Sequence, residues 1–237
     1  MIRLAPLLVL VVAATTAAAP VPPPTEKERL AKHWGTFEGQ GEYELTGNRL
    51  TLRTAGQPTF GLYLDSECLP IPRVTRTVRG DFEATVTVLY ATPPHKGARH
   101  DLQRLETQAG LFVGGGGSSV EFGLMQLHSK FNGIVADYLQ RCVWVRTRSD
   151  KASGGSMLKL APVGTSTHLR VVRKDKQVTV SYSFDGKTWS EPQEPGHDPE
   201  LPDEVAVGVS FSQSTYQTLS ADFHAFTLEK PKAAKKE

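Results

Sequence analysis

Apolar and polar residues alternate along most of this chain, which is the pattern of β-strands that bury one face. In residues 178–184, Val178, Val180, Tyr182 and Phe184 alternate with residues that carry hydroxyl groups. A period of two places successive side chains on opposite faces of a strand. The same pattern predicts strands at 41–45, 49–54, 74–78, 82–90, 108–113, 120–128, 135–147, 157–160, 168–173, 178–184, 205–211 and 221–228.

Turn residues separate several of these runs. Thr46-Gly47-Asn48 joins the first two, and Asp185-Gly186 follows residues 178–184. Asp-Gly is a preferred pair for a type I′ hairpin, which needs positive φ at both central positions, so a returning strand is expected after it. No segment has the period of an amphipathic helix, apart from a short turn near 102–105. Many short strands at hairpin spacing predict an all-β fold, a two-sheet antiparallel β-sandwich or jelly roll.

The two ends of the chain differ in composition from the middle. Residues 1–19 have the arrangement of a secretory signal peptide, with an apolar run too short to span a bilayer. Residues 20–32 are rich in proline and charge, which predicts a linker without a core of its own. Residues 230–237 are rich in lysine, which predicts a disordered tail. We therefore expect one β-sandwich domain, 33–229, in a secreted or periplasmic bacterial protein with no transmembrane segment in the mature chain.

The net charge of the chain narrows the classes of molecule that it is expected to bind. The chain has 27 Lys and Arg residues against 25 Asp and Glu residues, a formal net charge of +2. Acidic and basic residues nearly cancel, so the extended basic field that nucleic-acid binding requires is not expected. The oligomeric state does not follow from the sequence.

Cys68 and Cys142 are the only cysteines. In an oxidising compartment they can form a disulfide. The alternative is that Cys142 is a small buried residue on a strand and Cys68 a loop residue, because two cysteines do not make a disulfide framework. Mass spectrometry of the unreduced protein distinguishes the two interpretations.

Four segments also resemble a known family. They are GDFEATVTV (80–88), QAGLFV (108–113), HLRVVRKDKQVTVSYSFDGKTW (168–189) and VAVGVSFS (205–212). Their order and spacing resemble the concanavalin A-like lectin/glucanase superfamily, specifically the domain of unknown function shared with "regulation of enolase" proteins. Trp34-Gly35 and Pro72-Arg73-Val74 are similar to secreted, planctomycete-type members. The resemblance implies a curved jelly roll with a concave face and no defined chemistry, and a secreted chain would not act on a glycolytic enzyme.

The strand predicted at 135–147 carries the candidate binding site. Tyr138, Gln140, Trp144 and Arg146 fall on one face of it, and Glu121 and His128 come from the preceding strand. Sugar binding favours an aromatic platform beside planar amide or guanidinium donors. The alternative is that Trp144 belongs to the core and Tyr138 packs at an edge.

Catalysis has weaker support. Glucanases of the superfamily carry paired carboxylates, commonly Glu-x-Asp-x-x-Glu, and that motif is absent, with Glu121 alone on its strand. Residues 183–189 resemble the Asp-box of sialidases, but one residue is missing and the motif is not repeated. No metal motif occurs, although the acidic segment 197–204 has the oxygen ligands that calcium prefers.

Three hypotheses follow from these patterns. The leading one is a non-catalytic module that binds carbohydrate or another extracellular ligand on its concave face. The second is a glycan-active hydrolase with unrecognised catalytic residues. The third is a structural or protein-interaction module of the cell envelope.

Overall fold

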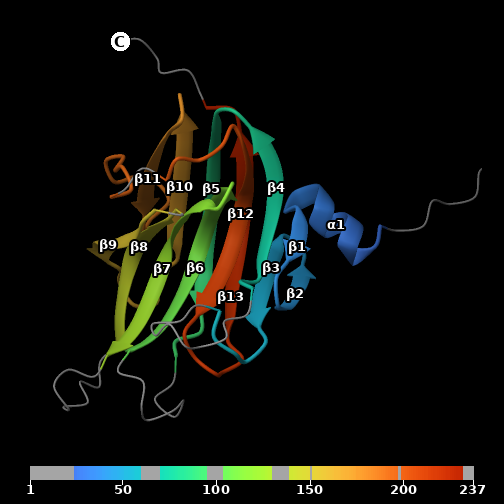
Figure 1. Cartoon of the computed structure of the whole chain (residues 1–237). Helices are drawn as coiled ribbons and strands as arrows, with labels where there is room; N and C mark the ends of the chain where they lie inside the picture. The colour runs from blue at the N-terminus through green and yellow to red at the C-terminus, as the bar shows by residue number, and fades with distance from the viewer. Residues whose placement is uncertain are drawn as a thin grey trace, which may run out of the picture.

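The computed structural model describes residues 24–59, 70–94, 104–129, 139–149, 151–196 and 199–231, which form two antiparallel sheets packed face to face and one short helix (Figure 1). The elements are α1 (Glu26–His33), β1 (Thr36–Glu38), β2 (Gly41–Thr46), β3 (Arg49–Thr54), β4 (Arg73–Arg79), β5 (Phe82–Ala91), β6 (Arg104–Gly115), β7 (Ser118–Ser129), β8 (Leu139–Arg148), β9 (Ser153–Leu160), β10 (Thr167–Lys174), β11 (Gln177–Ser183), β12 (Glu204–Gln213) and β13 (Ser220–Glu229). The predicted two-sheet β-sandwich is confirmed.

The strands divide into a seven-stranded and a six-stranded sheet. Sheet A has the order β1-β4-β12-β6-β7-β8-β9, and sheet B has the order β11-β10-β5-β13-β3-β2. Strands far apart in sequence are neighbours in both sheets, as in the pairing of β12 with β4 and β6. Most contacts that define the fold are therefore non-local, which is typical of a β-sandwich.

The core lies between the sheets and is built by alternate residues. Val120, Phe122 and Leu124 of β7 and Val143 and Val145 of β8 belong to one buried cluster, together with residues of sheet B. Because side chains alternate along a strand, the intervening residues of β7 and β8 lie on the opposite face of sheet A. We call this the outer face of sheet A.

The type I′ turn predicted at Asp185-Gly186 does not form, because only Gly186 of the two residues has a positive φ, of 71°. The Asp185 carboxylate accepts hydrogen bonds from the backbone amides of Lys187 (2.8 Å) and Thr188 (2.7 Å) and from the Ser183 hydroxyl (2.9 Å). These bonds hold the pKa of Asp185 well below its usual range. The side chain thus organises a compact turn. The chain does return antiparallel to β11, through an isolated bridge between Val180 and Gln193 and a hydrogen bond from the Ser190 amide to the Tyr182 carbonyl at 2.9 Å.

The type I′ pattern occurs one strand earlier. Asp175 and Lys176 connect β10 to β11 with φ values of 51° and 71°, although neither is glycine. The Asp175 amide donates to the Asp81 carboxylate at 3.0 Å, which helps to hold this conformation. A two-residue connection with positive φ at both positions matches the twist of the paired strands.

The structure differs from the prediction that residues 20–32 are a linker without a core. Its second half forms α1, with Thr25 as the N-cap. Leu30 and Trp34, four residues apart, are both buried in the inter-sheet core, and the Trp34 ring stacks on Phe226 of β13 with centroids 5.8 Å apart. The ordered sandwich therefore includes residues that precede position 33.

A capping box begins α1. The Thr25 hydroxyl accepts from the Glu28 amide at 3.3 Å, and the Glu28 carboxylate accepts from the Thr25 amide at 2.8 Å. We expect Thr25→Ala to destabilise the helix by about 1 kcal/mol, because one backbone donor loses its partner. Hydrogen exchange should show faster exchange confined to α1. Thr77→Ala, which removes an exposed hydroxyl on β4, is the control, and equal exchange rates in both variants would contradict the prediction.

Several predicted features lie outside the described residues: the signal peptide 1–19, Cys68, Tyr138, positions 197 and 198 of the acidic segment, and the tail from 232 onward. Cys142 is buried on β8, and its pairing with Cys68 stays a prediction. Within the described ranges, no helix has the length and apolar character needed to cross a membrane.

Candidate functional site

Residues on the outer face of sheet A line up in rows across neighbouring strands. Phe112 of β6 pairs with Glu121 of β7, which pairs with Arg146 of β8. The next row contains Gly110, Gly123 and Trp144, on the same three strands. Charged and aromatic side chains are thus adjacent at the centre of the sheet.

Arg146 lies between two buried carboxylates. Its guanidinium is 3.4 Å from the Glu106 carboxylate and 4.0 Å from that of Glu121. Glu106 is 1% exposed and Glu121 is 4% exposed. Buried charges are strongly destabilising unless they are paired, so the guanidinium holds both carboxylates and they in turn fix its position.

The contact between Glu106 and Arg146 requires sheet A to curve toward its outer face. Glu106 pairs with Leu127, six residues along β7 from Glu121. On flat strands six residues span about 20 Å, which is more than a glutamate and an arginine side chain together can cover. The curvature brings the two side chains together on the outer face.

Gly110 of β6 and Gly123 of β7 pair with each other and permit a close approach of these two strands. A Cβ at Gly110 would collide with the backbone of Phe122 and Gly123, and a Cβ at Gly123 would collide with the backbone of Ala109. Only hydrogen fits between the two strands at this row.

Trp144 forms the aromatic wall beside the ionic cluster. It packs against a small apolar cluster of Met125, Leu127 and Cys142, which is separate from the inter-sheet core. The indole lies over Gly155 of β9, where an added Cβ would be 2.7 Å from the Cζ2 atom. Trp144 is half-buried, so the alternative that places it in the main core is not what the structure shows.

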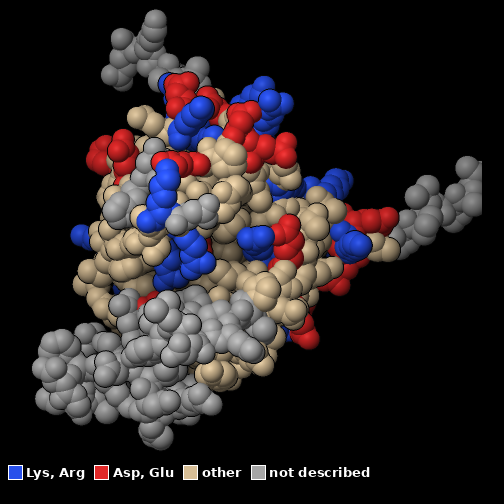
Figure 2. Space-filling view, viewed as in Figure 1, with Lys and Arg blue, Asp and Glu red and all other residues tan. Residues whose placement is uncertain are grey.

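A second aromatic residue extends the surface toward β4. Phe112 lies under the guanidinium of Arg73, 4.7 Å from the ring centroid. Arg73 also forms an ion pair with Glu38 of β1 at 2.8 Å. The outer face therefore presents aromatic rings and fixed charges from β1 to β8. Acidic and basic side chains both occur on the visible face, without a field of one sign (Figure 2).

Several buried polar atoms on this face have no hydrogen-bond partner among the described residues. They are the Gln108 Oε1, Glu121 Oε2, Trp144 Nε1 and Ser212 Oγ atoms. Gln108 pairs with Ser212 across β6 and β12 and with Met125 across β6 and β7, next to the glycine row. Unsatisfied buried polar groups are rare, and four of them gather on this face.

The structure brings some of the predicted site residues together and does not describe the side chains of others. Trp144, Arg146 and Glu121 lie together as expected, and the Gln140 amide contacts the Met157 sulfur at 3.6 Å on the same face. His128 pairs with Leu139 at the end of the β7–β8 ladder, but its side chain and Tyr138 are outside the described part of the chain.

Glu106 is the residue that the sequence pattern missed. The predicted strand began at Gln108, whereas β6 begins at Arg104. Extending the alternation of Gln108, Gly110 and Phe112 back by one step would have placed Glu106 on the same face. Glu121 therefore does not stand alone, and this corrects the expectation that no carboxylate partner is present.

The acidic segment considered for calcium contributes two carboxylates that contact cationic side chains. Asp203 binds Arg79 at 2.6 Å, and Glu200 binds Lys151 at 3.0 Å. The hydrogen bond from Arg79 holds the pKa of Asp203 below its usual value. Among the described residues, no group of three potential metal ligands is present, and positions 197 and 198 are not included in that search.

Comparisons with known proteins establish the fold. No protein-family model and no curated protein matches the sequence. The structure is similar to a functionally unknown protein from Saccharomyces cerevisiae, with a TM-score of 0.64, 17% identity, and coverage of 84% of this chain and 98% of that chain. It is also similar to a xylan β-1,4-xylosidase from Bacillus halodurans C-125, with a TM-score of 0.50 and 14% identity, covering 91% of this chain but 42% of the xylosidase.

A third similar structure is the carbohydrate-binding module CBM66 from Bacillus subtilis, with a TM-score of 0.43 and 10% identity, covering 83% of this chain and 97% of the module. At such identities similarity extends to the β-sandwich fold and not to activity. Any function must therefore be argued from the residues of this chain.

Proposed function

We propose that this protein binds carbohydrate on the outer face of sheet A and that it does so without catalysis. The observation that carries the proposal is Arg146, which two buried carboxylates hold beside the half-buried Trp144. Such a guanidinium is pre-organised, so less side-chain entropy is lost when it donates hydrogen bonds to hydroxyl oxygens.

The surrounding groups suit a sugar ring. The apolar face of a pyranose packs on an aromatic side chain, and its hydroxyl groups both donate and accept hydrogen bonds. Trp144 supplies the aromatic surface, Arg146 donates, and the oxygens of Gln108 and Ser212, which have no hydrogen-bond partner among the described residues, accept.

The wider setting belongs to the same proposal. The signal-peptide pattern at 1–19 supports a secreted or periplasmic bacterial protein whose β-sandwich domain extends to about 229. The four segments that resemble the "regulation of enolase" domain of unknown function support membership of the concanavalin A-like superfamily. A glycan of the cell envelope or surroundings is the partner that this location offers.

Trp144→Ala tests the site. We expect it to reduce retention on the recognised polysaccharide at least about tenfold, because one aromatic stacking surface is lost. The assay is affinity electrophoresis or a glycan array, run with and without chelator, with a melting curve for each variant.

The matched control is Trp189→Ala. Trp189 lies over Arg170 of sheet B, 4.5 Å from its guanidinium carbon, and so is a tryptophan away from the proposed site. Equal loss of binding in the two variants, or unfolding of Trp144→Ala, would overturn the proposal. Uniformly negative arrays would favour a protein partner in the envelope.

A glycan hydrolase is the second candidate, and Glu106 is the observation that favours it. Glu106 and Glu121 both lie within 4.0 Å of one guanidinium on one face, and hydrolysis of a glycosidic bond requires two carboxyl groups at close range. Release of reducing sugar from a bound polysaccharide would support this activity. It should then fall sharply in Glu106→Gln and Glu121→Gln while retention on the polysaccharide persists.

A further inference from the structure

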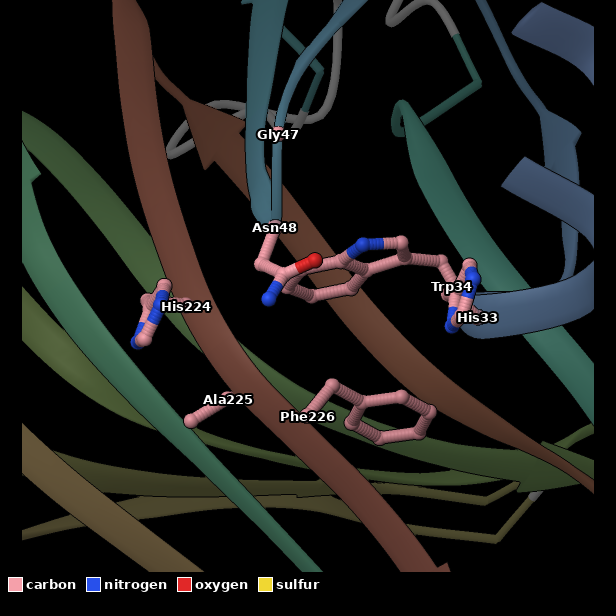
Figure 3. A pocket seen from close by; sticks show the side chains of 7 residues that line it. All are labelled: His33, Trp34, Gly47, Asn48, His224, Ala225 and Phe226. Atoms are coloured by element: carbon pink, nitrogen blue, oxygen red, sulfur yellow. The ribbon is translucent and has the colours of Figure 1, made fainter. Parts of the chain in front are cut away.

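A separate pocket of about 310 Å³ lies where α1, the β2–β3 turn and β13 meet (Figure 3). None of its lining residues belongs to the outer face of sheet A. They are His33, Trp34, Gly47, Asn48, His224, Ala225 and Phe226. A volume of this order is at the lower end for small-molecule sites.

A β-bulge in β13 shapes this pocket. The register of β13 against β5 shifts between His224 and Thr227, and Ala225 has a φ of 54°. In a regular strand the side chain of Ala225 would lie on the opposite face from those of His224 and Phe226. Here all three residues line one pocket. A non-glycine residue in this region is strained, and such strain gathers at functional sites.

Polar side chains converge on an aromatic pair. The Trp34 and Phe226 rings stack with an interplanar angle of 11°, and Figure 3 shows the Asn48 amide beside the indole, with the two imidazoles on either side of the aromatic pair. Asn48, His33 and His224 are exposed and make no side-chain hydrogen bond to any residue in the described part of the chain. Their donors and acceptors are available to a ligand.

The pocket lining offers N–H donors and no carboxylate, which suits an acidic ligand. None of the lining residues is Asp or Glu, and Arg49 is the cross-strand partner of His224. Asp222, the nearest acidic residue on β13, accepts a hydrogen bond from Thr51 at 2.7 Å and lies 4.0 Å from Arg49. Imidazole and amide N–H groups donate readily to a carboxylate.

We propose that this pocket binds a small carboxylate with an apolar ring face, the chemistry of a uronic acid. The ring lies against Phe226, and the carboxylate accepts hydrogen bonds from His224 and Asn48. This site is independent of the proposed carbohydrate site on sheet A, because the two share no residue.

The probes are D-glucuronate and its neutral counterpart D-glucose, titrated into the full-length protein by calorimetry and saturation-transfer NMR. We expect glucuronate to bind about tenfold more tightly than glucose, and His224→Ala and Asn48→Ala each to weaken it about tenfold, the effect of one hydrogen bond to a charged group. Trp189→Ala should leave the affinity unchanged.

Three outcomes would overturn this inference. They are no glucuronate binding at millimolar concentration, equal affinity for glucose, and loss of glucuronate binding in Trp144→Ala, which would place the ligand on sheet A. Because His224 and Asn48 are exposed, their replacement should not move the melting curve, so a loss of affinity is attributable to the pocket.

Discussion

Arg146→Met is expected to lower the free energy of unfolding by about 3–5 kcal/mol, because it leaves the carboxylates of Glu106 and Glu121 buried without their shared cation. Methionine retains much of the volume of the arginine stem, so the loss reflects charge more than packing. Urea denaturation followed by circular dichroism measures the change. Binding on the outer face should be lost in the same variant.

Two further variants show whether the loss of stability in Arg146→Met comes from a buried ion cluster or from an ordinary ion pair. Arg53→Met removes a surface pair with Glu44, at 2.8 Å with both side chains about half exposed, and should cost less than about 1 kcal/mol. Adding Glu106→Gln and Glu121→Gln to Arg146→Met should restore most of the stability, since no charge of this cluster then remains buried. If Arg146→Met were as stable as the wild type, the ionic cluster would not hold this face together.

The two-layer fold was predictable because hydrophobic alternation is a local signal that repeats along the chain. It located nearly every strand of both sheets, including the runs that became β5, β7 and β12. The helix α1 was missed because its eight residues follow three prolines and have only Leu30 as a buried apolar position. Its position depends on the tertiary contact of Trp34 with Phe226, which no local pattern reveals.

The type I′ turn predicted at Asp185-Gly186 does not form for an identifiable reason. An aspartate can accept bonds from the amides that follow it, and this competes with the hairpin that the pair otherwise favours. Asp175 and Lys176 adopt the type I′ conformation without a glycine because the paired strands β10 and β11 impose it.

The candidate site was predictable only in part. Alternation along β7 and β8 places Glu121, Trp144 and Arg146 on one face, and the antiparallel pairing makes Glu121 and Arg146 neighbours. Glu106 is three rows away, and its contact with Arg146 depends on curvature of the sheet. Curvature is a property of the whole sheet, so the alternation of side chains does not contain it.

Gly110→Ala should destabilise the protein by at least about 3 kcal/mol, because the new Cβ would collide with the carbonyl oxygen of Phe122 and the Cα atom of Gly123. Both obstacles are backbone atoms of a paired strand, so relief requires β6 and β7 to separate. That separation would flatten the sheet and move Glu106 away from Arg146. The variant should therefore lose binding on the outer face as well as stability.

Gly196→Ala is the matched control for this substitution. Its Cβ would meet only the Ser156 hydroxyl at 3.6 Å, an ordinary van der Waals contact, and Gly196 does not have a positive φ. Its unfolding midpoint in urea should match that of the wild type, whereas that of Gly110→Ala should fall well below it. Should Gly110→Ala retain both stability and binding, the close approach of β6 and β7 would not be what brings Glu106 to Arg146.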